Sequence, residues 1–136
     1  MSKIYSVDFD GTLNTENVFP DVGNPNIPLM QKLITLRADG AKLILNTCRN
    51  GKHLKAAVDF CKQYGLEFDA VNENLPSIID AFNGNDTRKI VASYYIDDRA
   101  VAPGDFLRMA THESFGAAGS KKSAETIEMP VNLERD

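Results

Sequence analysis

The sequence lacks the features that mark membrane, secreted and nucleic-acid-binding proteins. No apolar run in the chain approaches the ~20 residues that a membrane-spanning helix needs. The N-terminus has no charged segment followed by a long apolar stretch, so no signal peptide is expected. Basic and aromatic residues do not alternate along any stripe, and the net charge is −4, which disfavours a nucleic-acid partner. We therefore expect a cytoplasmic protein without a membrane partner.

Cysteine and histidine are also scarce, and this limits the metal sites that the chain could build. The two cysteines, Cys48 and Cys61, do not have the spacing of a metal-ligand motif. Free thiols in a cytosolic chain are the simplest interpretation. His53 and His112 stand alone in the sequence, so we expect them to be surface or packing residues.

The size and composition of the chain favour one globular domain. Its 136 residues suffice for a single hydrophobic core, and 43% hydrophobic with 25% charged residues is ordinary for such a domain. We expect a core domain over residues 1–104. Residues 105–136 would form a C-terminal extension that packs on the core or is partly mobile. The sequence leaves both a monomer and a homo-oligomer open.

Apolar periodicity predicts alternating strands and helices. We expect strands at residues 4–7, 42–47, 68–71 and 92–96, separated by helices that begin near residues 28, 54 and 76. Such alternation implies right-handed βαβ units and a doubly wound parallel sheet, which is an α/β fold. Residues 14–27 are rich in Asn, Pro, Asp and Gly and should form a loop beside the sheet. Beyond residue 104 we expect a helix near residues 106–110 and an edge strand or packed tail at 126–133.

Two carboxylates directly follow the first predicted strand. Asp8 and Asp10 are one residue apart, and Gly11 breaks the strand pattern and would let the backbone approach a ligand closely. In an open α/β sheet, ligands bind at this carboxyl end of the strands. Carboxylates this close repel each other unless a cation or a proton lies between them. An ordinary solvated turn is the alternative interpretation of this segment.

Further polar residues follow the other predicted strands. Thr47 ends the second strand, the pair Asp97 and Asp98 ends the fourth, and Lys89 lies just ahead of the fourth. Because the ends of parallel strands meet at one edge, these residues can converge. Several carboxylates in one crevice suit a hard cation with oxygen ligands such as Mg²⁺.

This order of motifs resembles that of the haloacid dehalogenase (HAD) superfamily across residues 4–98. The matching residues are Asp8-Phe9-Asp10-Gly11-Thr12, Thr47, Lys89 and Asp97-Asp98. The resemblance implies a HAD-like phosphatase with a Rossmannoid core that hydrolyses a small phosphorylated substrate through an aspartyl-phosphate. Residues 13–27 are too short for an inserted domain, and the segment between Thr47 and Lys89 is taken up by a helix, a strand and a helix. The resemblance is therefore to members without a cap domain.

The resemblance also implies a role for each matching residue. Asp8 would be the nucleophile, Asp10 the general acid and base, Thr47 a hydrogen-bond donor to the phosphoryl group, and Lys89 the neutralising cation. The Mg²⁺ site would draw on Asp8, Asp97 and the backbone carbonyl of Asp10, with Asp98 acting through water or orienting the others. The substrate would lie against Gly11, Thr12, Cys48 and Arg49.

Several alternatives stay open at this point. Arg88 could replace Lys89 as the cation, Asp98 could pair with Arg99, and Arg49 could be a surface charge instead of a substrate contact. A receiver-like phospho-acceptor module uses similar residues, but in such modules Thr and Lys follow the second acidic group, whereas here they precede it. A HAD-fold binding protein without turnover is a third possibility.

Overall fold

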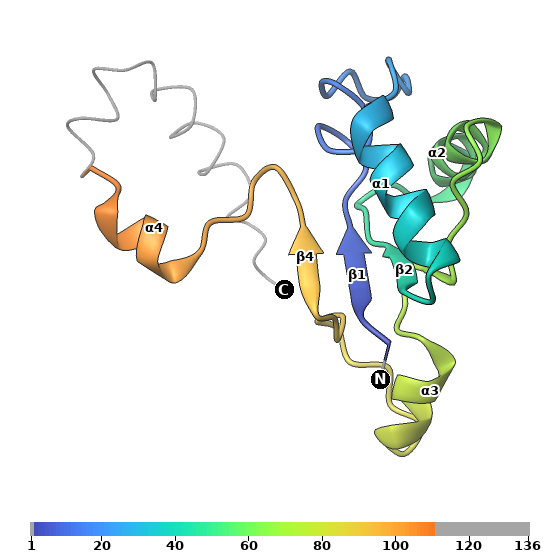
Figure 1. Ribbon diagram of the computed structural model, residues 1–136, viewed down its shortest axis with the longest axis vertical. Coiled ribbons are helices and arrows are strands. Elements are labelled where there is room, and N and C mark those ends of the chain that lie inside the picture. Colours follow the sequence, from blue (N-terminus) through green and yellow to red (C-terminus); the bar gives the residue numbers. More distant parts are fainter. Residues whose placement is uncertain (1, 111–136) are drawn as a thin grey trace. The chain divides into compact units, whose positions relative to one another are not determined.

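The computed structural model describes residues 2–110, and these residues form an α/β fold (Figure 1). The chain divides into two compact units, Met1–Ala100 and Val101–Asp136. The boundary expected at residue 104 lies slightly beyond this division. The division falls in the segment between β4 (Tyr94–Ile96) and a short helix α4 (Pro103–Arg108) that belongs to the second unit. The tail expected at residues 126–133 lies outside the described residues.

The first unit contains the alternating strands and helices that the sequence predicts. In chain order they are β1 (Ile4–Val7), α1 (Ile27–Ala38), β2 (Lys42–Leu45), α2 (Gly51–Gln63), β3 (Ala70–Val71), α3 (Pro76–Ala81) and β4 (Tyr94–Ile96). A loop occupies residues 14–26, and residues 46–93 are taken up by α2, β3 and α3 with their connections. Within residues 2–100 no further domain is inserted. No helix in residues 2–110 is long and apolar enough to cross a membrane.

The sheet confirms the parallel arrangement and fixes where a ligand could bind. Its four strands, within residues 2–110, are all parallel and lie in the order β3-β2-β1-β4. The chain builds outward from β1 through β2 and β3 and then returns to place β4 on the other side of β1. The strand order therefore reverses between β1 and β4, and such a reversal opens a crevice beyond the carboxyl ends of the strands. Val7 is level with both Leu45 and Ile96, so the three strands end together.

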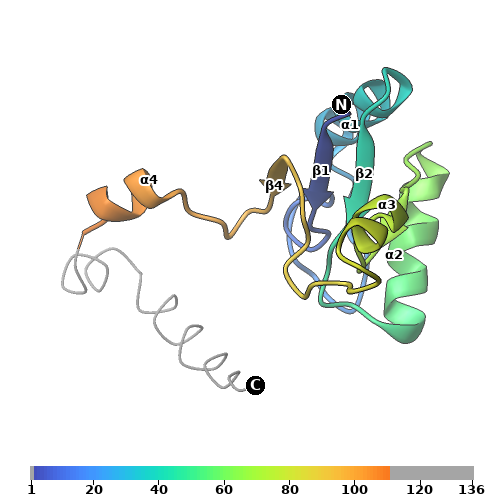
Figure 2. The same ribbon diagram turned by 90° about the horizontal axis from the view of Figure 1, so that it is seen from below.

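The hydrophobic core consists of two clusters of different size, one on each face of the sheet. On one face, Val7, Leu43 and Leu45 pack against residues of α1 and α2, which include Met30, Leu33, Ala57 and Phe60. On the other face, a smaller cluster joins Ile44, Ala70, Leu75 and Ile90. The continuous burial of β2 on both faces agrees with its unbroken apolar sequence. Figure 2 shows β1 and β2 side by side with α2 running alongside them.

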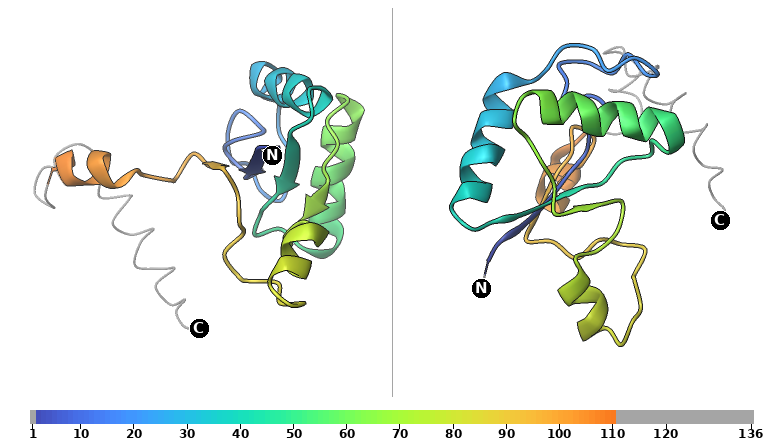
Figure 3. Two further views of the ribbon diagram at one scale, coloured as in Figure 1. Left: turned by 60° about the horizontal axis from the view of Figure 1, so that its bottom comes forward. Right: turned by 90° about the vertical axis from the view of Figure 1, so that its right-hand side faces the viewer.

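The loop of residues 14–26 is held against the first unit by buried polar contacts. Asn14, which is buried, accepts a hydrogen bond from the Gly11 N–H and donates one to the Val22 carbonyl. Asn26 donates to the Thr12 carbonyl and accepts from the Leu29 N–H, so it ends the loop and caps α1. In the right-hand view of Figure 3 this loop runs past the first turn of α2. The loop therefore lies at the same edge of the sheet as the ends of β1 and β2.

Candidate functional site

Three carboxylates meet at the crevice between β1 and β4. Asp8 directly follows β1, and its N–H donates to the Ile96 carbonyl at 2.9 Å, which continues the pairing of the two strands. Asp97 and Asp98 directly follow β4. One carboxylate oxygen from each of Asp8, Asp97 and Asp98 lies within 4.8 Å of the others. The convergence of these three residues, expected from their positions at strand ends, is confirmed.

The environment of Asp8 disfavours its ionised form. Burial, together with the charges of Asp97, Asp98 and Asp10, raises the pKa of Asp8 from its ordinary 3.8 to about 6, against the lowering effect of the Phe9 N–H. A cation close to these carboxylates would reverse that balance, because it favours the ionised form. The oxygen-only donor set and its concentrated negative charge fit a hard cation such as Mg²⁺.

Gly11 and Thr12 hold Asp98 in place. The Asp98 N–H donates to the Thr12 hydroxyl oxygen at 3.1 Å, and that hydroxyl donates to the Asp98 carboxylate at 3.3 Å. Gly11 has a φ of +83°, and a Cβ atom at this position would lie 2.5 Å from an Asp98 oxygen. Thr12 is only 6% exposed and does not line the pocket described below. Neither Gly11 nor Thr12 lines that cavity, and both residues fix the position of Asp98. Their contact with a substrate stays a prediction.

The loop after β2 is ordered by a residue that sequence reasoning missed. Asn72 accepts a hydrogen bond from the Thr47 N–H at 2.7 Å and donates one to the Arg49 carbonyl at 3.2 Å. Its φ of +55° lies in the left-handed region, which Asn tolerates better than most residues. The Thr47 oxygen accepts from the Arg49 N–H, so its hydroxyl proton can still be donated to a ligand. The position of Asn72 directly after β3 was the available signal for this role.

Arg49 is buried, and all five of its side-chain N–H donors are engaged. Two N–H groups donate to the two carboxylate oxygens of Asp10, at 2.9 and 2.8 Å. The other three donate to the carbonyls of Pro20, Asp21 and His53. A guanidinium group has five donors, so none remains for a substrate. Arg49 thus ties Asp10, the loop of residues 14–26 and the first turn of α2 together.

The surroundings of Arg49 exclude one of the two interpretations of this residue. With 3% exposure, Arg49 is not a surface charge. It lines the cavity described below, and its contact with a substrate stays a prediction. Its guanidinium lies 4.8 Å from the ring centroid of Phe9 and 5.0 Å from that of Phe19, so aromatic rings cover it as well. The Asp10 carboxylate faces Arg49 and does not belong to the acidic group of Asp8, Asp97 and Asp98. The expected metal ligand from Asp10 is its backbone carbonyl, and that stays a prediction.

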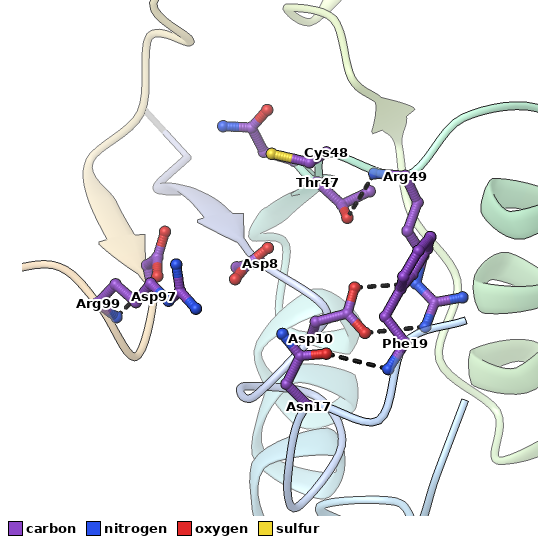
Figure 4. A pocket seen from close by; sticks show the side chains of 10 residues that line it. Asp8, Asp10, Asn17, Phe19, Thr47, Cys48, Arg49, Asp97 and Arg99 are labelled. Carbon is purple, nitrogen blue, oxygen red and sulfur yellow. Dashed lines mark hydrogen bonds and ion pairs between the residues drawn. The ribbon is translucent and has the colours of Figure 1, made fainter. Parts of the chain in front are cut away.

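A cavity of about 510 Å³ opens in front of these residues (Figure 4). Thr47 and Cys48 line it, as expected, and Cys48 is exposed. Sequence reasoning missed several residues that also line it. The full lining is Asp8, Asp10, Asn17, Phe19, Asn46, Thr47, Cys48, Arg49, Asp97 and Arg99. Phe19, which comes from the loop of residues 14–26, is 52% exposed, so part of its ring is available to a ligand.

Neither Lys89 nor Arg88 lines this cavity. The Lys89 ammonium lies 5.4 Å from the centroid of the Tyr95 ring, so the prediction that Lys89 sits beside Asp8 is wrong for this structure. The segment ahead of β4 is fixed by the buried Asn74, which accepts from the Val91 N–H and donates to the Thr87 carbonyl. These bonds hold the segment against the smaller core cluster. Asp98 likewise forms no ion pair with Arg99 or any other residue within 2–110.

The strand order and the position of the acidic group define a Rossmann-like α/β domain with a candidate metal site at its switch point. No protein-family model and no curated protein matches the chain. A solved structure, that of a conserved protein from Bacteroides thetaiotaomicron, is similar to it with a TM-score of 0.65 and 35% sequence identity. The match covers 74% of this chain and 79% of the other. The chain therefore belongs to the same family as that conserved protein, whose description states no activity.

Proposed function

We propose that this protein is a Mg²⁺-dependent phosphohydrolase of the HAD type, which acts on a small phosphorylated substrate through an aspartyl-phosphate. The observation that carries the proposal is the meeting of Asp8, Asp97 and Asp98 within 4.8 Å at the strand ends. The cavity in front of them, with Thr47 on its wall, gives room for a phosphate ester. The motif order along the sequence, which resembles that of the HAD superfamily, supports the same reaction.

The three carboxylates would hold the Mg²⁺ ion. Bound there, the ion would supply positive charge that lets an anionic phosphate approach the anionic Asp8. Gly11 and Thr12 would support the site indirectly, because they fix the position of Asp98. Asp10 would contribute no carboxylate oxygen to the ion while Arg49 holds both of its oxygens.

In the proposed reaction, an Asp8 carboxylate oxygen attacks phosphorus and forms a new P–O bond. The bond between phosphorus and the ester oxygen breaks, and the leaving group departs with the bonding electron pair and takes up a proton. Water then attacks the phosphorus of the aspartyl-phosphate, the bond to Asp8 breaks, and inorganic phosphate leaves. The Thr47 hydroxyl would donate a hydrogen bond to a phosphoryl oxygen, since its proton is not engaged by the Arg49 N–H.

Asp10 is the residue to which the resemblance gives the general acid and base role. Both of its oxygens accept hydrogen bonds from Arg49, an arrangement that suits the carboxylate form. As a carboxylate Asp10 could accept a proton from the hydrolytic water. To donate a proton to the leaving group, it would first have to release at least one bond to Arg49.

This engagement of Asp10 favours a second candidate function. A HAD-fold protein that binds a metal and a phosphate without turnover would need no free acid, and the Arg49 pair would be a permanent feature of its site. Phosphate release separates the two functions. The purified protein is incubated with Mg²⁺ and a panel of phosphorylated small molecules, with EDTA and the Asp8→Asn variant as controls. Release that needs both Mg²⁺ and Asp8 supports the enzyme, whereas binding of these ligands without release supports the second candidate.

A further inference from the structure

We propose that Arg99 binds the phosphoryl group of the substrate and provides the cationic side chain that the resemblance expects from Lys89. This inference rests on the proposed function, because it assumes that a phosphate enters the cavity lined by Asp8 and Thr47. It assigns Arg99 as a phosphate-binding residue, a role that the resemblance to the HAD motifs does not give it.

The site needs a cationic side chain. A phosphate ester carries negative charge, and the cavity presents it with the carboxylates of Asp8 and Asp97, with Asp98 close by. A single divalent ion leaves part of this charge uncompensated once the phosphate is added. Phosphoryl-transfer sites generally combine their metal ions with an arginine or lysine that contacts the phosphoryl oxygens.

The cationic side chains near the cavity leave one candidate. Arg49 lines the cavity, but its five donors are engaged by Asp10 and by the carbonyls of Pro20, Asp21 and His53. Lys89 does not line the cavity, and its ammonium lies over the ring of Tyr95. Arg99 is the other arginine in the lining. Within residues 2–110 its guanidinium has no hydrogen-bond or ion-pair partner, so its donors are free.

The backbone of Arg99 is held where its side chain can serve the site. Its N–H donates to the Asp97 carboxylate at 2.9 Å, which fixes the turn directly after β4. In Figure 4 Arg99 lies beside Asp97 on the β4 side of the cavity, opposite Arg49. The planar guanidinium can donate two parallel hydrogen bonds to a phosphate, a geometry that an ammonium group does not match. The position and the free donors together assign Arg99 to the phosphoryl group.

Binding of inorganic phosphate tests this assignment without relying on turnover. Calorimetry in the presence of Mg²⁺ would compare the wild type with Arg99→Ala, Arg99→Lys and Lys89→Ala, and p-nitrophenyl phosphate hydrolysis would be measured in parallel. Arg99→Ala should weaken phosphate binding by about 10- to 100-fold, the range for lost hydrogen bonds to a charged group. Arg99→Lys should recover part of this loss, and Lys89→Ala should change the affinity by less than about 3-fold. Mg²⁺ binding without phosphate should persist in Arg99→Ala, which shows that the site is intact.

The outcomes separate this inference from the proposed function. If the wild type binds phosphate through Arg99 but hydrolyses nothing, the assignment stands and the enzymatic function falls. If the wild type hydrolyses the ester and Arg99→Ala keeps both its phosphate affinity and its kcat/KM, the assignment falls and the function stands. A larger loss in Lys89→Ala than in Arg99→Ala also overturns the assignment. A wild type that neither binds phosphate nor hydrolyses the ester overturns both.

Discussion

Replacing Asp8 by Asn should stabilise the metal-free protein at neutral pH, although it removes the proposed nucleophile. Burial and the neighbouring carboxylates raise the pKa of Asp8 from 3.8 to about 6. An acid whose pKa is higher in the folded state binds more protons when folded. The metal-free protein therefore loses stability as the pH rises from about 4 to about 6. Above about pH 6 Asp8 is charged in the folded state, and its charge lowers the free energy of unfolding. Asn has the same shape without the charge.

The size of the effect follows from the pKa. A shift of about two units corresponds to about 3 kcal/mol at about 1.4 kcal/mol per unit. Asp8 is only half-buried, and solvent screening reduces this figure to about 1–2 kcal/mol. For a domain of this size each kcal/mol moves the melting temperature by about 4–8 °C. Asp8→Asn should therefore melt about 4–16 °C above the wild type at neutral pH in EDTA.

Thermal unfolding in EDTA across the pH range measures this difference. The gap between the variant and the wild type should shrink as the pH falls towards about 4, where Asp8 is protonated in both states. Asp80→Asn, at an exposed position in α3, is a matched control and should leave the melting temperature nearly unchanged. Added Mg²⁺ should raise the melting temperature of the wild type more than that of Asp8→Asn. An Asp8→Asn variant that melts below the wild type at neutral pH, or a gap that does not depend on pH, would refute the electrostatic reasoning.

Two further substitutions test the contacts around the site. Arg49→Ala should lower the free energy of unfolding by about 3–5 kcal/mol, because it leaves the largely buried carboxylate of Asp10 without its partner and removes the buried Arg49 side chain from its carbonyl contacts. Arg49→Lys should recover only part of this loss, since lysine lacks the five-donor fork. Chemical denaturation checks this, and a loss below about 1 kcal/mol would contradict a stabilising role for the Arg49–Asp10 pair. Gly11→Ala should weaken Mg²⁺ binding by displacing Asp98, which calorimetry can measure against Gly84→Ala, a substitution at a similar φ with no neighbour within 4 Å. Equal Mg²⁺ affinity in the two variants would show that the close approach of Asp98 is unimportant.

The parallel sheet and the acidic group could be predicted because both depend on local patterns. Apolar strands that end in Asp8 and Asp97 bring their carboxylates to the same edge in any parallel sheet, whatever the details of packing. The similar reasoning for Thr47 and Cys48 also holds, since they follow the neighbouring strand. The position of a residue at a strand end is therefore enough to predict at which edge of the sheet it lies.

The positions that the sequence did not predict are those of long side chains and loops, because they depend on tertiary contacts. Arg49 could reach either solvent or the interior, and only the fold of residues 14–26 supplies the carbonyls that engage its donors. Lys89 was placed by sequence order alone, whereas the hydrogen bonds of the buried Asn74 decide the path of its segment. Phe19 lines the cavity but belongs to a loop whose sequence has no hydrophobic periodicity. None of these contacts leaves a repeating signal in the sequence.

The most direct test of the proposed reaction is detection of a phosphoryl group on Asp8. The protein is mixed with Mg²⁺ and p-nitrophenyl phosphate, quenched in acid, and digested for mass spectrometry of the peptide that contains Asp8 and Asp10. The account predicts a phosphoryl group on Asp8 in the wild type, and none in EDTA or in the Asp8→Asn variant. Turnover without a phosphorylated Asp8, or a phosphoryl group on Asp10 instead, would contradict it.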